Sequence, residues 1–330
     1  MKISIIVLSY NKIELTKKCL ASLKKNTLDG ILVEIVVVDN ASTDGSVDFL
    51  RSLKWIKLIE NKENLGFSRA NNQGAKESRG DILVFLNNDT EVRSGWLEGI
   101  TEIFETEKNV GAVGIKLLFP DGKIQHAGLI ISKDKVPRHI YYRENMDKPY
   151  VCGMREFQAV TAACIAVPKK VFEEVGGFDE GFKNGLEDVD LCLRIREKGY
   201  KIIYQPKSVV IHHESMSPGR FKGNLHNANL YMKKWGDKVI PDEHEKYRED
   251  GFGWLYILTQ DLKNMAYSGD EYGTVPLHIK IMKVIYIPIQ KTVTVVTLIL
   301  KGDFKTLRQK TKKVLSFSAK DKASEGQGHE

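Results

Sequence analysis

The chain has 330 residues, 42% hydrophobic and 28% charged, which is the composition of a soluble globular protein with room for one large domain or two smaller ones. The net charge is +7, but residues 301–330 carry eight Lys or Arg against four Asp or Glu, so +4 of that total lies there. The rest of the chain is nearly balanced in charge, which argues against a broad nucleic-acid-binding face and against nucleic acid as a partner.

The cysteines have no C-x-x-C spacing, which argues against a zinc site or a disulfide framework. Reduced, buried thiols in a cytosolic protein fit them better. The four are Cys19, Cys152, Cys164 and Cys192. At the N-terminus, the apolar run 3–8 is too short for the core of a signal peptide and predicts a first strand instead.

The first ninety residues alternate between strand and helix patterns. Strands are expected at 3–8, 33–38, 55–59 and 82–86, and helices at 13–25, 45–53 and 68–78. Strands separated by helices of this length are typical of βαβ units, so the pattern predicts a mostly parallel sheet.

Each expected strand ends in polar or glycine residues. The segments after the four strands include Ser9-Tyr10-Asn11, Asp39, Asn64-Leu65-Gly66 and Asn87-Asn88-Asp89-Thr90. Because the carboxyl ends of parallel strands share one edge of a sheet, these segments should converge on one crevice. Ligands of open α/β sheets bind there.

Two of these segments predict specific ligands. A carboxylate flanked by amides, as at 87–89, offers hard oxygen ligands that suit Mg²⁺ or Mn²⁺ better than zinc. The alternative is a polar strand-to-helix turn in which Asp89 or Thr90 acts as a cap. Asp39 is placed to accept hydrogen bonds from a nucleobase or ribose, or else to cap a turn.

Gly66 opens a helix that carries Arg69 in its first turn. This arrangement lets the backbone approach a phosphate and adds a positive charge, unless it is a simple turn with a solvated arginine. No G-x-G-x-x-G is present, so a dinucleotide-binding fold has no direct support.

The middle of the chain is less regular. Helices are expected at 96–107 and 168–175, and strands at 110–118, 128–132 and 157–167. The polar segment 133–150 is expected to be a surface excursion that forms part of an acceptor pocket or a lid.

A second polar cluster, Glu187-Asp188-Val189-Asp190, opens a helix that ends at Gly199. Its carboxylates either complement the helix dipole or supply a general base. Residues 201–211 predict two short strands around Gln205-Pro206. His212 comes directly after the second, as a metal ligand or as a structural residue.

Together these motifs resemble the inverting family 2 glycosyltransferases of the GT-A fold, and among them the rhamnosyltransferase-like enzymes of bacterial polysaccharide synthesis. The resemblance covers roughly residues 1–240 and rests on motifs in a fixed order. The motifs are SIIVLSYNK at 4–12, VVVDNASTDGS at 36–46, NLGFSRANNQG at 64–74, FLNNDTEV at 85–92, GGFDEGF at 176–182, LEDVDLCLRIREKGYKI at 186–202 and VIHHESMS at 210–217.

The resemblance implies a role for each motif. The nucleotide-sugar donor would be bound by Ser9, Tyr10, Asn11, Asp39, Asn64, Gly66, Arg69, Asn87 and Asn88. A divalent cation, Mg²⁺ or Mn²⁺, would be held by Asp89 and His212. Asp188 would be the catalytic base, with Glu187 as the second candidate. Asn87 departs from the family's D-x-D, because it stands where the first Asp is expected and removes one negative charge.

The implied fold is an α/β GT-A domain, a Rossmann-like and mostly parallel sheet flanked by helices, at residues 1–240. A helical, amphipathic extension is expected at 241–315 and a disordered tail at 316–330. The implied activity is metal-dependent, inverting transfer of a sugar from a donor such as dTDP-rhamnose or a UDP-sugar to a saccharide or lipid-linked acceptor in cell-surface polysaccharide synthesis. The alternative is a non-catalytic nucleotide-sugar-binding or assembly protein that keeps the fold.

The extension leaves two interpretations open. Its longest uncharged run, 292–300, is far shorter than a membrane-spanning helix needs. Apolar residues beside the basic stretch 301–313 fit either an interfacial helix on an anionic inner leaflet or a helical layer packed on protein. The protein is therefore expected to be cytoplasmic, and in the first case peripheral on the inner face of the cell membrane.

Overall fold

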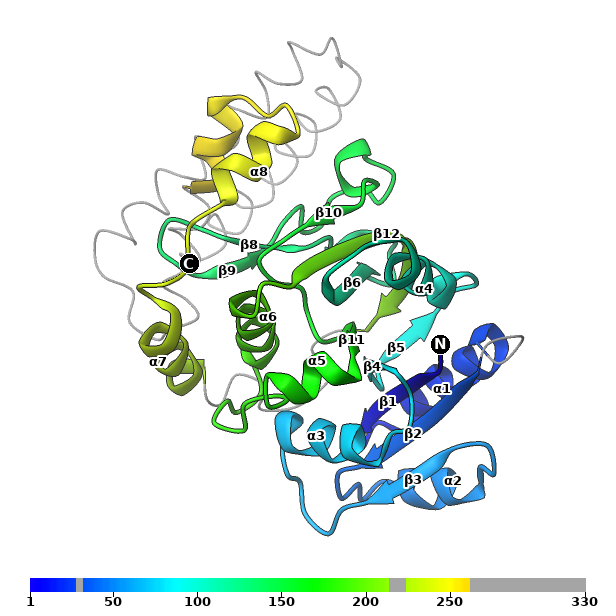
Figure 1. Ribbon diagram of the computed structural model, residues 1–330. Coiled ribbons are helices and arrows are strands. Elements are labelled where there is room, and N and C mark those ends of the chain that lie inside the picture. Colours follow the sequence, from blue (N-terminus) through cyan, green and yellow to red (C-terminus); the bar gives the residue numbers. More distant parts are fainter. Residues whose placement is uncertain (28–31, 214–223, 262–330) are drawn as a thin grey trace, which may run out of the picture. The chain divides into compact units, whose positions relative to one another are not determined.

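The computed structural model describes residues 1–27, 32–213 and 224–261. Contacts divide the chain into two compact units, Met1–Asp250 and Gly251–Glu330, and the strands of the described residues all lie in the first (Figure 1). Most of the expected C-terminal extension, from residue 262 onward, and the tail lie outside the described residues. Within the described part of the chain, no helix combines the length and the apolar character that crossing a membrane requires.

The N-terminal half of the sheet is built from alternating strands and helices, as the sequence predicts. Its elements are β1 (Ile3–Ser9), α1 (Ile13–Thr27), β2 (Val33–Asp39), α2 (Ser46–Ser52), β3 (Lys57–Glu60), α3 (Phe67–Glu77) and β4 (Ile82–Asn87). Strands β3, β2, β1 and β4 lie side by side in that order, each parallel to its neighbour. Their polar carboxyl ends therefore lie along one edge, as expected.

The second half extends the same sheet. Its elements are β5 (Thr90–Val92), α4 (Trp96–Thr106), β6 (Val110–Leu118), β7 (Ile124–His126), β8 (Leu129–Ile131), β9 (Pro137–His139), the 3₁₀ helix η1 (Pro149–Val151), β10 (Arg155–Glu156), β11 (Cys164–Pro168), α5 (Lys169–Glu174), α6 (Glu187–Glu197), β12 (Lys201–His212), α7 (Asn224–Trp235) and α8 (Glu243–Glu249). Strand β11 is antiparallel to both β4 and β6 and so joins the two halves. Strand β12 is parallel to β6 on the other side of that strand.

Two hydrophobic layers enclose the sheet. On one face, Ile6 and Phe85 belong to a buried cluster with residues of α3, α5 and α6. On the other face, Ile5 and Val84 belong to a cluster with α1 and α4, including the fully buried Trp96. Because helices cover both faces, the central strands are mostly apolar on both sides and show no regular alternation with polar residues.

Four details differ from the prediction. The strand expected at 157–167 begins only at residue 164, as β11, and Cys152 is exposed although the cysteines were expected to be buried. Residues 201–211 were expected to form two short strands, but they belong to one strand, β12, whose register shifts between Gln205 and Val209. Pro206 has no N–H to donate, and a bulge accommodates it without ending the strand. The expected excursion at 133–150 also contributes β9, which pairs with β8.

Candidate active site at the carboxyl edge of the sheet

The carboxyl ends of three central strands lie in register. Ser9 at the end of β1 is paired with Asp39 at the end of β2, and Leu8 is paired with Asn87 of β4. The loops after these strands therefore start from the same edge. The convergence predicted from the sequence is present.

The loops after β1 and β2 are tied to each other through Ser42. Asp39 is only 1% exposed, and its carboxylate accepts from the Ser42 amide (2.8 Å) and hydroxyl (2.7 Å). The Asn11 amide donates to the Ser42 hydroxyl (2.7 Å), and the Asn11 side-chain oxygen accepts from the Thr43 amide (2.7 Å). Asn11 has a positive φ of 54°, a backbone state that asparagine tolerates better than most residues.

Asn40, which no sequence motif marked as functional, holds the loop after β3 in place. It is buried, donates to the Asn64 side-chain oxygen (2.8 Å) and accepts from the Leu65 amide (3.0 Å). The same Asn64 oxygen accepts from the Gly66 amide (2.9 Å), and Gly66 precedes α3 with a positive φ of 79°. Arg69 lies on the first turn of α3 and is exposed. The only sequence signal for Asn40 is its position directly after Asp39.

The remaining expected donor residues differ in their exposure. Ser9 is fully buried, with its hydroxyl 3.5 Å from that of Thr16. Asn88 is partly buried and also donates to the Thr16 hydroxyl (2.9 Å). Tyr10 is 42% exposed. Ser9 and Asn88 therefore help to shape the edge, whereas Tyr10 presents its ring to the outside.

Asp89 and His212 meet at this edge although they are far apart in the sequence. Strand β5 is antiparallel to the end of β12, with Thr90 paired to His212, and the His213 amide donates to the Asp89 carbonyl (2.9 Å). Nε2 of His212 consequently lies 3.0 Å from Oδ1 of Asp89 and 3.5 Å from the side-chain nitrogen of Asn87. Both side chains of the pair are largely buried, at 5% and 17% exposed.

This pair fits a divalent cation. With metal–ligand bonds of about 2.1 Å, neighbouring ligand atoms of an octahedral ion lie about 3 Å apart, and the two facing atoms have that separation. A carboxylate with one imidazole leaves further positions for other oxygen ligands. Asp89 and His212 could therefore hold a cation that also has other oxygen ligands.

The second cluster sits on a strained turn. Asn184, Gly185 and Leu186 all have positive φ, of 64°, 132° and 69°. A run of this kind is uncommon, and a leucine in it is strained; such strain concentrates at functional sites. The turn aims the first residues of α6, Glu187 and Asp188, back toward the sheet.

Asp188 is partly buried at the start of α6. Its carboxylate accepts from the amides of Ala162 (3.1 Å) and Val189 (2.9 Å). Burial raises the pKa of Asp188 above its ordinary value, against the lowering effect of these hydrogen bonds. Glu187 is 6% exposed and accepts from the Gly185 amide, so it stabilises the turn itself.

A short path in the sheet links Asp188 to the first cluster. The residue after Ala162, Ala163, accepts a hydrogen bond at its carbonyl from the Asn87 amide (3.0 Å). Asp188 is therefore bonded to the segment leading into β11, which runs beside the end of β4. The two polar clusters of the sequence thus lie at the same edge.

Asp190, the third carboxylate of that motif, has a different environment. It is fully buried and lies 2.8 Å from Nε of Arg194, 2.9 Å from the Trp235 indole nitrogen and 2.5 Å from Nζ of Lys234. These contacts anchor α6 to α7. Asp190 is therefore a structural residue.

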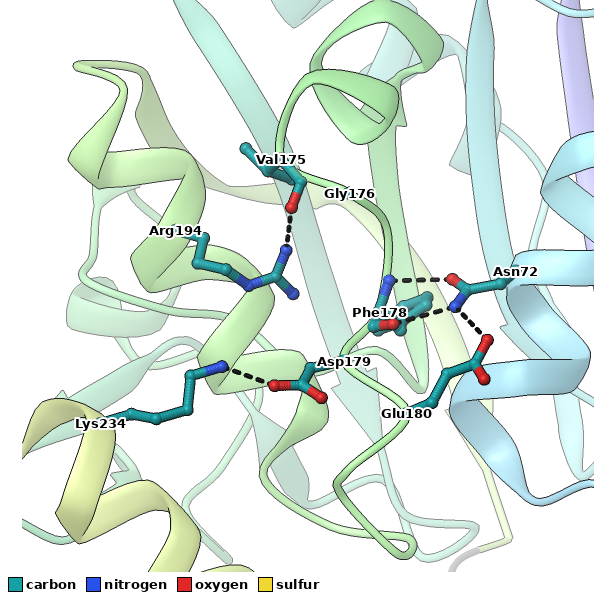
Figure 2. Close-up of a pocket in the computed structure, with 8 residues that line it drawn as sticks. All are labelled: Asn72, Val175, Gly176, Phe178, Asp179, Glu180, Arg194 and Lys234. Atoms are coloured by element: carbon teal, nitrogen blue, oxygen red, sulfur yellow. Dashed lines mark hydrogen bonds and ion pairs between the residues drawn. The ribbon is translucent and has the colours of Figure 1, made fainter.

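Figure 2 shows how the turn at 175–180 is held. Asn72 of α3 accepts from the Phe178 amide and donates to its carbonyl, both at 2.9 Å. Arg194 donates to the main chain of the same turn, and Lys234 donates to Asp179 (2.6 Å). These side chains line a pocket of about 380 Å³. They fix the turn from three helices.

Comparison with known proteins identifies the family of the chain. The model of the family described as Glycosyl transferase family 2 matches residues 4–176. The chain belongs to glycosyl transferase family 2. The matched region contains the loops after β1, β2 and β3 and Asp89, whereas Asp188 and His212 lie beyond it.

Individual family 2 relatives differ in length. The O-antigen biosynthesis protein RfbC of Myxococcus xanthus is 34% identical over 226 residues, which cover 66% of this chain but 18% of the relative. An uncharacterised protein of Sinorhizobium fredii is 32% identical, with 66% and 25% covered. The chain thus spans a quarter or less of these two proteins. An N-acetylglucosaminyl-diphospho-decaprenol L-rhamnosyltransferase of Mycobacterium tuberculosis is 26% identical over 251 residues, with 67% and 79% covered.

Two solved structures share the fold. GalNAc-T7, solved with UDP, GalNAc and Mn²⁺, has a TM-score of 0.56 at 17% identity, covering 84% of this chain and 59% of that one. The mannosyltransferase PcManGT of Pyrobaculum calidifontis, solved with GDP-Man and Mn²⁺, has a TM-score of 0.55 at 20% identity, covering 89% and 83%. This family 2 chain therefore has the GT-A fold that its motifs predict.

Proposed function

We propose that the protein is a metal-dependent, inverting glycosyltransferase that moves a sugar from a nucleotide-sugar donor to a saccharide or lipid-linked acceptor. The observation that carries the proposal is the meeting of Asp89 and His212, 3.0 Å apart, at the sheet edge that also bears Asp39 and Asp188. A diphosphate-metal centre and a base for a hydroxyl are the two requirements of such a transfer.

The donor is placed by the loops after β1, β2 and β3. Asp39 and the segment 9–11 are positioned for the nucleoside, and the turn at Asn64 and Gly66 for the diphosphate, with Arg69 adding charge. The hydrogen bonds through Ser42 and Asn40 keep these loops in one arrangement before a donor binds. Such preorganisation lowers the entropic cost of binding.

The cation would be held by Asp89 and His212 and by oxygens of the donor diphosphate, with Asn87 beside them. When bound, it would offset the negative charge that develops on the departing nucleoside diphosphate. Because one protein ligand is a nitrogen, this pair of ligands favours Mn²⁺ over Mg²⁺, which binds almost only to oxygen. Mn²⁺ also accompanies the nucleotide or donor in the two related structures.

Asp188 is the proposed general base. Its carboxylate takes the proton of an acceptor hydroxyl, whose oxygen attacks the anomeric carbon from the side opposite the leaving diphosphate and so inverts that carbon. A carboxyl pKa raised by burial makes the base stronger, and a base with a pKa nearer the working pH is more effective. Glu187 is the weaker candidate, because it bonds to its own turn.

The nature of the substrates is inferred from the relatives by analogy. One relative is named as an L-rhamnosyltransferase of N-acetylglucosaminyl-diphospho-decaprenol, and another as an O-antigen biosynthesis protein. A dTDP-rhamnose-like or UDP-sugar donor and a lipid-linked acceptor of cell-surface polysaccharide synthesis are therefore proposed. The matching location is the cytoplasm.

A donor screen tests the proposal. Purified protein is incubated with Mn²⁺ or Mg²⁺ and a panel of nucleotide-sugars, and released nucleoside diphosphate is measured with and without candidate acceptors. The wild type should release diphosphate from one donor class in a metal-dependent manner, and Asp188→Asn should bind the same nucleotide but transfer at least about 100-fold more slowly. Undiminished transfer by Asp188→Asn would contradict the assignment of the base.

A further inference from the structure

Gln125 lies against the proposed metal ligand His212. Its side-chain oxygen is 2.6 Å from Nδ1 of His212, and the two residues are only 3% and 4% exposed. Gln125 belongs to β7, far from both sequence motifs of the site. It was not among the residues expected to be functional, and no sequence pattern marks it.

A β-bulge directs Gln125 to this position. Strands β6 and β7 pair Leu118 with Ile124 and Leu117 with His126, so the register shifts by one residue at Gln125. Bulges of this kind redirect a side chain and are common next to active sites. The irregularity therefore aims the Gln125 side chain at the end of β12.

We propose that Gln125 is a positioning residue that fixes the tautomer and orientation of His212 for metal binding. The inference rests on the proposed metal-dependent transfer. Because the facing atom of Gln125 is a carbonyl oxygen, Nδ1 of His212 must carry the hydrogen and donate it. In the neutral ring Nε2 then keeps its lone pair, and Nε2 is the atom that faces Asp89.

The alternative is that Gln125 merely satisfies a buried polar atom, as most buried polar groups require. The two roles predict different results. A structural partner affects folding whether or not His212 is a metal ligand. A positioning partner affects the metal affinity through His212, as residues bonded to metal-ligating histidines do, typically by 10–100-fold.

The first test measures Mn²⁺ affinity in the presence of UDP or dTDP, from the electron paramagnetic resonance signal of free Mn²⁺. Gln125→Leu, which removes the acceptor at similar volume, should weaken Mn²⁺ binding roughly 10–100-fold. Gln125→Glu keeps an acceptor and should stay within about threefold of the wild type. Unchanged affinity in Gln125→Leu would overturn the inference.

A double-mutant cycle separates positioning from folding. In a His212→Ala background, Gln125→Leu should cause no further loss of Mn²⁺ affinity, because the residue through which it acts is gone. An equal loss in both backgrounds would overturn the inference. Equal Mn²⁺ binding by the wild type and His212→Ala would instead contradict the metal site of the proposed function, and this inference with it.

The neighbouring pair His213 and Glu91 supplies a matched control. Nε2 of His213 lies 2.7 Å from Oε1 of Glu91, so this histidine, next to His212 in the chain, has an acceptor of its own. The acceptor of His212 is Gln125 instead. Glu91→Gln should leave Mn²⁺ affinity within about twofold of the wild type. A loss matching that of Gln125→Leu would overturn the specific role of Gln125.

The tautomer itself can be observed without turnover, in protein loaded with diamagnetic Mg²⁺ and UDP, where the cation and not a proton lies between Nε2 and Asp89. Long-range ¹H–¹⁵N spectra of ¹⁵N-histidine-labelled protein, assigned by comparison with His212→Ala, should report Nδ1 as the protonated nitrogen of the neutral His212 ring. The same pattern is expected for Gln125→Glu and should be lost in Gln125→Leu. A neutral ring protonated at Nε2 in the wild type would overturn the inference.

Discussion

Nε2 of His212 lies 3.0 Å from Oδ1 of Asp89 because Thr90 and His212 are paired across β5 and β12. The pairing brings the end of the last strand back to the end of β4, so one carboxylate and one imidazole share a largely buried position. Two hydrogen bonds, one from the main chain and one to Gln125, support the arrangement. Both side chains are therefore oriented by parts of the fold that lie outside their own motifs.

Replacing Asp89 tests the proposed metal site through the ligand that faces His212. Asp89→Ala removes the only carboxylate of the proposed ligand pair, and we expect sugar transfer to fall by at least about 100-fold at saturating donor, since a Lewis-acid metal supplies several kcal/mol. The measurement is initial rate against Mn²⁺ concentration, with thermal unfolding as the control for folding. Full activity at any Mn²⁺ concentration, or activity unaffected by a chelator in the wild type, would contradict the centre.

Restoring the charge that Asn87 lacks gives an opposite prediction. Asn87 lies 3.5 Å from Nε2 of His212 and is partly buried, so Asn87→Asp would place a second carboxylate beside the proposed cation. We expect Mn²⁺ to bind more tightly, by roughly tenfold, because a close charge in a partly buried site is worth more than about 1 kcal/mol. Titration of Mn²⁺ without nucleotide measures this directly. Weaker binding would mean that Asn87 does not face the cation.

Asn40 provides a test of the loops after β2 and β3, which are proposed to bind the donor. Its side chain bonds to Asn61, Asn64 and Leu65, and it is buried. Asn40→Ala should lower the free energy of unfolding by about 2 kcal/mol, because several buried groups lose their partner. It should also weaken nucleotide binding, which calorimetry with UDP and dTDP would measure. A stability loss with unchanged nucleotide affinity would separate this loop from donor binding.

The carboxyl edge of the sheet could be predicted from the sequence because each strand and its polar end are neighbours in the chain. Apolar runs that end in Asp39 and Asn87 are readable without the structure, and parallel pairing then brings their ends together. The Asp89 to His212 contact was beyond such reasoning, since β5 has three residues and its partner lies far along the chain. Its position after a strand made His212 a candidate metal ligand, and the resemblance then paired it with Asp89.

Residues that act through buried polar contacts were missed for a related reason. Asn40 follows a strand, as many turn residues do, so its contact with Asn64 cannot be recognised from the sequence. The position of Gln125 depends on a β-bulge that no sequence pattern predicts. The 186–190 motif is a different case. Its three carboxylates look alike in the sequence, yet burial and partners separate Asp188 from Glu187 and Asp190.

The raised pKa of Asp188 predicts a pH-dependent stability. Between the ordinary carboxyl pKa and the raised one, the unfolded chain has lost this proton while the folded chain retains it, so stability falls as pH rises through that window. Asp188→Asn stays neutral and keeps an acceptor for the Ala162 amide, but the Val189 amide loses its acceptor at every pH. We therefore expect the unfolding temperature of the variant, relative to that of the wild type at the same pH, to rise from about pH 4 to pH 7. Calorimetric scans across pH measure this, and a difference that does not change with pH would contradict the unfavourable burial of the charge.

Asp190 should behave in the opposite way to Asp188. Asp190→Asn leaves Arg194 and Lys234 without the fully buried carboxylate that they share, and removing one partner of a buried ion pair costs about 3 kcal/mol. Asp179→Asn is the matched control, because Asp179 also pairs with Lys234 (2.6 Å) but is 33% exposed and should cost less than about 1 kcal/mol. Chemical denaturation gives both values, and activity per folded molecule should remain near that of the wild type in each. Equal losses of stability in the two variants, or loss of activity in folded Asp190→Asn, would contradict the assignment of Asp190 as the buried anchor between α6 and α7.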